Sequence, residues 1–142
     1  MDYIDSCVII AAYFPNDPNH EIAEKYFEEL KLGKRKGIIS IFGICEIAGF
    51  ISRNSSPEDS LKFIKELIKL PNFYIWYALD FKEFMNSCTS LAISRGLSGA
   101  DSIHAISSLS ILEVKRFITL DSHFRKIGDL IEVVKPDGNK LL

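Results

Sequence analysis

The apolar run YIDSCVII near the start of the chain contains a single charged residue, Asp5. A charged side chain in such surroundings is costly unless a partner or a cation balances it. One structural alternative is that Asp5 caps a helix beginning directly after it. The first question that the sequence poses is therefore what balances this carboxylate.

Three further acidic residues stand out in the same way. Glu46 is the only charged residue in segment 37–52, and Asp101 is the only acidic residue in segment 88–112. Asp121 directly follows a β-rich segment. An unpaired carboxylate in apolar surroundings is costly or is driven neutral. These residues therefore need either solvent or a shared counter-ion.

Each of these three acids also has a structural alternative. Glu46 can lie on a narrow solvent-exposed stripe of its helix, although a helix this apolar is expected to be mostly buried. Asp101 follows Ser98 by three residues, which is the spacing of a capping box. Asp121 can cap the short helix that follows it. A capping role does not exclude chemistry at the same position.

One arrangement accounts for all four acids, namely convergence on a polar pocket in which a hard cation balances their charge. Mg²⁺ and Mn²⁺ prefer oxygen ligands, and they bind through a few carboxylates together with waters and substrate phosphates. Parallel α/β sheets bind ligands outside the carboxyl ends of their strands. Asp5 and Asp121 are each expected at such an end. The sequence therefore predicts a Mg²⁺ or Mn²⁺ site formed by Asp5, Glu46, Asp101 and Asp121.

Short β-rich segments alternate with longer helical segments along the chain. Strands are expected at 2–5, 38–40, 73–79, 116–120 and 131–134. Helices are expected at 6–14, 20–32, 41–52, 57–70, 81–96, 98–112 and, as one short turn, 121–128. This alternation predicts a three-layer α/β/α fold whose mostly parallel sheet is covered on both faces. The length of 142 residues and the ordinary composition favour a single domain over 1–142.

Charge and hydropathy narrow the functional classes. The net charge of −2 and the pI of about 5.9 argue against strong, sequence-independent binding of nucleic acid. No apolar run reaches the roughly 20 residues of a membrane span, and no signal peptide is visible, so a cytoplasmic protein is expected. The sequence contains neither a nucleotide-binding glycine-rich loop nor a serine hydrolase elbow.

The three cysteines, Cys7, Cys45 and Cys88, are odd in number and widely spaced. This pattern disfavours both a disulfide framework and a zinc site. All three are expected to be small buried apolar residues.

Four segments together resemble a known family. In order and spacing, YIDSC, CEIAG, GADSIHAI and ITLDSHF are similar to the successive motifs of the PIN domain, the ribonuclease domain of VapC-type toxins. The resemblance implies a five-stranded sheet ordered 3-2-1-4-5. It implies that Asp5, Glu46 and Asp101 hold the principal metal and that Asp121 supports a second ion or the attacking water. By the same resemblance, Ser6 and Thr119 line the site.

Several residues near these motifs have expected roles that follow from their own chemistry and position. Arg95, Arg125 and Lys126 adjoin the last two acidic motifs and are the candidates for phosphate contacts. His104 lies three residues after Asp101, but an all-oxygen magnesium site needs no imidazole, so a structural role is favoured. Cys7 stands where the family more often has serine or asparagine, and His123 where it often has another acid.

The resemblance implies a metal-dependent endoribonuclease that leaves 5′-phosphate and 3′-hydroxyl ends and is the toxin of a toxin–antitoxin pair. An RNA substrate, a cognate antitoxin and a homodimer are the partners implied. One alternative is a PIN-like module that binds RNA or protein without cleavage, although the presence of all four acids argues against it. A further alternative is an RNA-processing nuclease that has no antitoxin.

Overall fold

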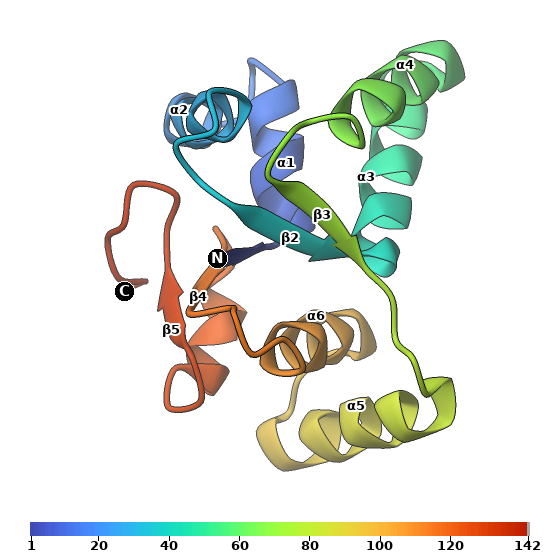
Figure 1. Cartoon of the computed structure of the whole chain (residues 1–142), viewed down its shortest axis with the longest axis vertical. Coiled ribbons are helices and arrows are strands. Elements are labelled where there is room, and N and C mark those ends of the chain that lie inside the picture. The colour runs from blue at the N-terminus through green and yellow to red at the C-terminus, as the bar shows by residue number, and fades with distance from the viewer. Residues whose placement is uncertain (142) are drawn as a thin grey trace.

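A parallel sheet of five short strands forms the middle of the computed structural model, which describes residues 1–141 (Figure 1). The strands lie in the order β3-β2-β1-β4-β5, and every neighbouring pair is parallel. Their bounds are β1 (Asp2–Ile4), β2 (Gly37–Ser40), β3 (Phe73–Trp76), β4 (Arg116–Ile118) and β5 (Glu132–Val134). The predicted fold class and strand order are confirmed.

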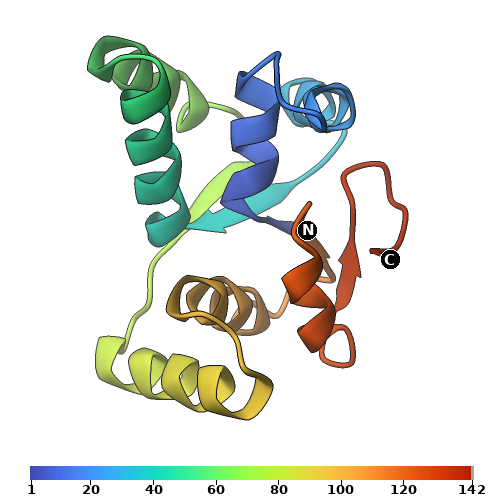
Figure 2. The ribbon, with the colours of Figure 1, turned by 180° about the vertical axis from the view of Figure 1, so that it is seen from behind.

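Helices cover both faces of the sheet, as the opposite views in Figures 1 and 2 show. One face carries α1 (Ser6–Tyr13), α2 (His20–Lys31), α3 (Ile41–Asn54) and α4 (Pro57–Leu67). The other carries α5 (Phe81–Arg95), α6 (Gly99–Leu109) and the 3₁₀ helix η1 (Ser122–Ile127). No helix within residues 1–141 is long and apolar enough to span a membrane.

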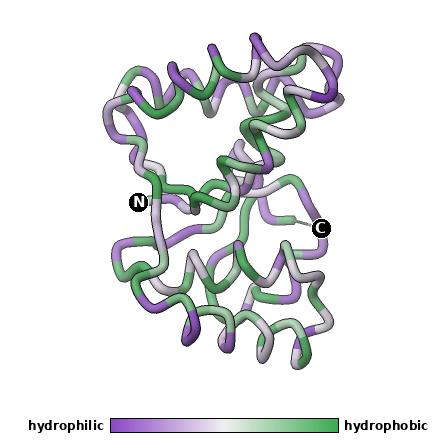
Figure 3. Tube along the Cα trace, turned by 90° about the vertical axis from the view of Figure 1, so that its right-hand side faces the viewer, coloured by the Kyte–Doolittle hydropathy of each residue, from purple (hydrophilic) through white to green (hydrophobic). Residues whose placement is uncertain are grey.

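The two faces of the sheet bury separate hydrophobic clusters. Successive residues of a strand point to opposite faces, so Ile4 joins the cluster beneath α1 to α4 while Tyr3 joins the cluster beneath α6 and η1. Hydrophobic and hydrophilic positions alternate along the helices, as expected when one side of each packs on the sheet (Figure 3). Strand β1 is therefore buried on both sides.

Four elements end two or three residues earlier than the sequence predicted. Strand β3 ends at Trp76 rather than at residue 79, and β4 ends at Ile118 rather than at residue 120. The cause for β3 is its partner: Trp76 pairs with Ser40, and Ser40 is already the N-cap of α3, so no neighbouring strand continues. Helix α4 ends at Leu67 rather than at residue 70, and α6 ends at Leu109 rather than at residue 112.

The expectation that all three cysteines are buried was wrong for Cys45. Cys88 is buried, and burial raises the pKa of its thiol to about 11. Cys7 is partly buried, whereas Cys45 is exposed on α3. Helix α3 packs on the sheet through residues such as Ile44 and Ile47, and Cys45 falls on its outward side.

Helix α3 approaches the sheet closely at one glycine. A Cβ atom at Gly43 would lie 2.6 Å from the buried side chain of Ile39 and 3.0 Å from Cε1 of His104. A Cβ atom at Gly49, on the same helix, would meet only the end of the exposed Arg53 side chain, also at 3.0 Å.

We expect Gly43→Ala to lower the free energy of unfolding by about 1–3 kcal/mol, because the added methyl group overpacks a buried contact. Gly49→Ala is the matched control. It should be neutral or stabilising by up to about 1 kcal/mol, because alanine favours the helix and Arg53 can move. Urea denaturation of the metal-free protein measures both, and equal stability of the two variants would contradict this packing.

Candidate functional site

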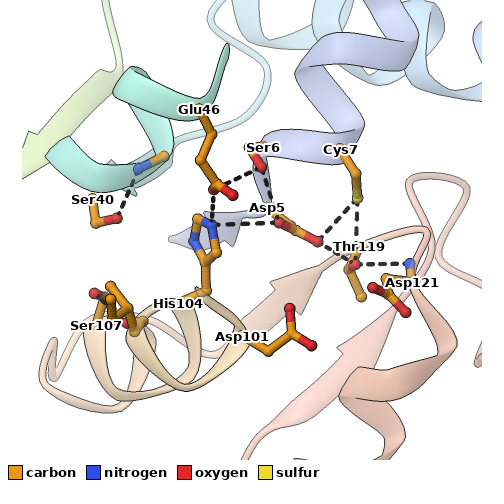
Figure 4. A network of polar contacts seen from close by, with 12 residues as sticks. Asp5, Ser6, Cys7, Ser40, Glu46, Asp101, His104, Ser107, Thr119 and Asp121 are labelled. Atoms are coloured by element: carbon orange, nitrogen blue, oxygen red, sulfur yellow. Dashed lines mark hydrogen bonds and ion pairs between the residues drawn. The ribbon is translucent and has the colours of Figure 1, made fainter. Parts of the chain in front are cut away.

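The four predicted acids come from four separate elements and face one region at the carboxyl edge of the sheet (Figure 4). Asp5 directly follows β1, and Asp121 follows β4. Because Ile4 pairs with Ile118, the segments leaving these two strands lie side by side. Glu46 reaches the region from α3 and Asp101 from the first turn of α6.

Asp5 is buried and is held by side chains from both strand ends. Its Oδ2 accepts hydrogen bonds from Thr119 Oγ1 at 2.6 Å and from Cys7 Sγ at 3.0 Å. Ser6 Oγ lies 3.5 Å from Oδ1. Although Asp5 occupies the N-cap position of α1, its side chain makes no capping hydrogen bond. The capping alternative for Asp5 was therefore wrong.

Glu46 is partly buried, with 32% of its side chain exposed, so it is neither a fully solvated nor a fully buried residue. Its Oε1 accepts hydrogen bonds from Ser6 Oγ, at 3.0 Å, and from His104 Nε2. The His104 side chain is only 2% exposed, and its Nδ1 lies 2.8 Å from Tyr3 Oη. His104 is thus a buried histidine with both nitrogens engaged, in agreement with the structural role that the sequence favoured.

The pKa of His104 reflects two opposing influences. Burial lowers it, but the hydrogen bond that His104 donates to Glu46 and the negative charges of Asp5, Glu46 and Asp101 outweigh burial and raise it above the usual value. Nε2 also lies 3.8 Å from Asp5 Oδ1. The imidazole therefore sits between two of the predicted acids.

Asp101 and Asp121 lie on the other side of Asp5, together with His123. One ligand atom from each of these three residues falls within 4.8 Å of the others. The structural alternatives also hold, because Ser98 Oγ accepts the Asp101 N–H at 3.1 Å and Asp121 Oδ1 accepts the His123 N–H at 2.9 Å. Capping and clustering thus coexist.

The contrast with Asp2 shows that this acidic cluster is unusual within the protein. Asp2 is also buried, but Arg116 binds it through two hydrogen bonds of 2.9 and 2.8 Å, and Tyr26 Oη donates a third at 2.9 Å. Among residues 1–141, by comparison, no lysine or arginine forms an ion pair with Asp5, Asp101 or Asp121. The cluster therefore has excess negative charge.

The three predicted phosphate-binding cations lie near the end of α5 and on η1. Arg95 forms a two-pronged ion pair with Asp129, at 2.7 and 2.9 Å, and also donates to the Lys126 carbonyl. Lys126 Nζ donates to the Gly96 carbonyl at 2.9 Å. Arg125 donates to the carbonyl of Ser122 within η1, at 3.2 Å, and its side chain is exposed.

The sequence profile of the PIN domain matches residues 3–130. This chain belongs to the PIN domain family. A search of curated proteins finds no significant match to this PIN domain.

Solved structures with the same fold include toxins of toxin–antitoxin systems. The sarcin–ricin loop cleaving toxin VapC20 of Mycobacterium tuberculosis superimposes with a TM-score of 0.73 at 10% identity, over 90% of this chain and 95% of that chain. VapBC-1 of Haemophilus influenzae superimposes with a TM-score of 0.66 at 20% identity, over 96% of this chain and 99% of that chain. A toxin–antitoxin complex from Klebsiella pneumoniae superimposes with a TM-score of 0.67 at 13% identity, over 99% of this chain and 100% of that chain.

Sequence reasoning left three residues of this PIN domain without an assigned contact. His123 joins the acidic cluster, Cys7 donates to Asp5, and His104 bonds to Glu46. For His123 and Cys7 a signal existed, since each departs from the usual motif beside a predicted acid. For His104 the partner lies 58 residues away along the chain, which no local pattern reveals.

The pKa of Asp101 is raised above its ordinary value. Burial is the largest cause, the Ser98 hydrogen bond opposes it, and the charges of Asp121 and Asp5 raise the pKa further. The folded protein therefore holds this proton to a higher pH than the unfolded chain does. The stabilisation linked to that proton is complete below the ordinary carboxyl pKa and is lost as the pH rises through the folded pKa.

We therefore expect Asp101→Asn to raise the melting temperature of the metal-free protein at neutral pH and to change it little in acid, below about pH 4. The backbone bond to Ser98 is retained in this variant. Glu113→Gln, an exposed acid on a loop, is the control. Calorimetry in EDTA at several pH values measures the effect, and a lower melting temperature at neutral pH would show that the Asp101 carboxylate stabilises the fold.

Proposed function

We propose that this PIN domain is a metal-dependent endoribonuclease that hydrolyses phosphodiester bonds of RNA. The observation that carries the proposal is the grouping of Asp101 and Asp121 with His123, next to Asp5, which Thr119 links to the Asp121 backbone; none of the three aspartates has a lysine or arginine partner among residues 1–141. Acids in this state destabilise a fold, so their presence is better explained by a function that needs them.

The donor set fits a divalent cation. Carboxylate oxygens from Asp5, Asp101 and Asp121 are the ligands that Mg²⁺ and Mn²⁺ prefer, and His123 adds an imidazole beside them. Burial, together with the charges of Asp121 and Asp5, raises the pKa of Asp101. Glu46 would contribute a further carboxylate ligand, on the side of Asp5 where Ser6 and His104 donate hydrogen bonds to Glu46.

When bound, the cation would activate water and stabilise charge on the reacting phosphate. The protein groups would fix the acids that hold it. Thr119 holds Asp5 Oδ2 while it accepts the Asp121 N–H at 3.0 Å, so one hydroxyl group links the ends of β1 and β4. Cys7 donates to the same oxygen of Asp5. These bonds limit rotation of the Asp5 carboxylate and preorganise the site.

RNA is the substrate that the surroundings support. Arg125 is exposed on η1, two residues after His123, and would contact an approaching phosphate. Balancing four acids with metal changes the formal net charge from −2 to +2, which reduces repulsion of a polyanion. The RNA-cleaving activity in the name of VapC20 and the predicted cytoplasmic location agree with this substrate.

Purified protein should cleave RNA with Mg²⁺ or Mn²⁺ and lose activity in EDTA. Asp5→Asn should reduce kcat by about 100-fold or more, because misplacing the cation removes several kcal/mol of transition-state stabilisation. Arg125→Gln should mainly raise KM. Cleavage of labelled RNA measures both variants, with Asp17→Asn, an acid remote from the site, as the control. Equal cleavage by wild type and Asp5→Asn would disprove the catalytic role, and binding without cleavage would favour a recognition module.

We further propose that the protein is the toxin of a toxin–antitoxin pair and forms a homodimer. The antitoxin proposal is supported by the solved complexes that share its fold. The dimer proposal is supported by three exposed side chains, Tyr77 and Leu79 between β3 and α5 and Phe81 at the start of α5, beside an apolar groove of about 420 Å³. Covering such a surface with a second copy would remove apolar area from water.

Induced expression of the protein should therefore arrest bacterial growth, because RNA cleavage blocks translation. Asp5→Asn should permit normal growth at equal protein level. Co-expression of a short reading frame adjacent to its gene should restore growth and yield a stable complex by size-exclusion chromatography. Growth arrest that persists in Asp5→Asn would argue against a toxin acting through this site.

A further inference from the structure

We propose that His104 is a positioning residue that fixes the Glu46 carboxylate for metal-dependent catalysis, an inference that rests on the proposed function. Helix α6 carries both Asp101, in the predicted metal site, and His104, one turn later. Glu46 comes from α3, on the opposite face of the sheet. His104 therefore ties two elements of the site together across the end of the sheet (Figure 4).

The direction of each hydrogen bond follows from the chemistry of the partners. An ionised carboxylate can only accept, so Nε2 of His104 must carry the hydrogen that points at Glu46 Oε1. At the other nitrogen, Tyr3 Oη lies 2.8 Å from Nδ1, and the same hydroxyl accepts the Ser40 N–H at 3.3 Å. In the neutral ring, the Tyr3 hydroxyl donates to Nδ1. The backbone at the end of β2 thereby orients Glu46 through Tyr3 and His104.

Packing holds the ring in this orientation. The rings of Tyr3 and Phe42 contact the imidazole edge-on, at centroid distances of 5.9 and 5.7 Å. Gly43 provides the space, because a Cβ atom there would lie 3.0 Å from Cε1 of the ring. With both nitrogens engaged and the ring enclosed, His104 is not available as a metal ligand.

The consequence for Glu46 is that its two oxygens are no longer equivalent. Oε1 accepts from both Ser6 and His104, while no hydrogen bond to Oε2 occurs within residues 1–141. A glutamate on an otherwise apolar helix face would sample several rotamers if it lacked these bonds. His104 therefore leaves Oε2 available to the cation or to its bound water in one defined position.

Four variants separate positioning from packing. His104→Phe keeps a ring but removes both nitrogens, and Tyr3→Phe removes only the hydroxyl that anchors Nδ1. Glu46→Gln removes the group through which His104 is proposed to act. Phe63→Leu is the control, because the Phe63 ring packs on those of Tyr13 and Phe27 rather than on the imidazole. Circular dichroism and melting temperature establish that each purified variant is folded.

We expect His104→Phe to weaken Mn²⁺ binding by about 10- to 100-fold in titration calorimetry, the usual effect of removing a partner that orients a metal ligand. It should lower kcat for RNA cleavage while KM changes by less than about threefold. Tyr3→Phe should shift both quantities in the same direction by a smaller factor. Phe63→Leu should leave Mn²⁺ affinity within about twofold of wild type, since it alters packing away from the imidazole.

The decisive comparison is the double variant. If His104 acts through Glu46, adding His104→Phe to Glu46→Gln should have little further effect on Mn²⁺ affinity. A full additional loss in the double variant, or unchanged affinity in folded His104→Phe, would overturn the inference. If His104→Phe does not fold, the same test is made with Tyr3→Phe, introduced once into the wild-type protein and once into Glu46→Gln.

A spectroscopic measurement separates this inference from the proposed function. In metal-free protein labelled with ¹⁵N-histidine, the buried Nε2–H of His104 should give a slowly exchanging proton resonance that shifts in Glu46→Gln. That result would support the positioning contact even if no RNA is cleaved. A resonance that is absent, or unmoved in Glu46→Gln, would overturn the inference even if the protein proves to be a ribonuclease.

Discussion

The parallel pairing of β1 with β4 is the constraint on which the rest of the site depends. Ile4 opposite Ile118 brings together two chain segments that are more than a hundred residues apart in sequence. The residues that follow, Asp5 and Thr119, then meet at 2.6 Å. A one-residue slip in register would turn these side chains to opposite faces of the sheet. The two hydrophobic clusters oppose such a slip, because they bury Ile4 on one face and Tyr3 on the other.

Two buried aspartates, Asp2 in β1 and Asp5 directly after it, are in opposite electrostatic situations. At the amino edge of the sheet, Asp2 is neutralised by Arg116 and contributes to the fold. At the carboxyl edge, Asp5 receives only neutral donors and the histidine at 3.8 Å. Pairing a buried carboxylate fully would remove the charge that a cation requires. The aspartate at the amino edge of the sheet thus stabilises the fold, whereas the aspartate at the carboxyl edge keeps its charge for the proposed cation.

Hydroxyl and imidazole groups shape the carboxylate cluster. Thr119 and Ser6 each bridge two parts of the site, and His104 extends the network inward to Tyr3. Hydroxyl donors orient a carboxylate without neutralising it, because they carry no charge. The network thus reconciles two requirements, namely fixed acid positions and a net negative charge. Gly43 contributes by letting α3 approach the ring of His104.

The sequence by itself determined the elements and the types of residue available for chemistry. Alternating β-rich and helical segments were enough for the three-layer fold, and the caps Ser98 and Asp121 were visible because they act over two or three residues. The strand order came from the family resemblance. The four acids stood out because their apolar surroundings made each of them costly.

Only the tertiary structure decided which side chains become partners. The bond between His104 and Glu46 joins residues 58 positions apart, and Arg95 reaches Asp129 across 34 positions. Strand β3 stops at Trp76 because its neighbour β2 ends in the cap of α3. The physical reason is one of range: hydrophobic periodicity and capping depend on neighbouring residues, whereas ion pairs, strand ends and the grouping of His123 with two aspartates depend on how distant segments pack.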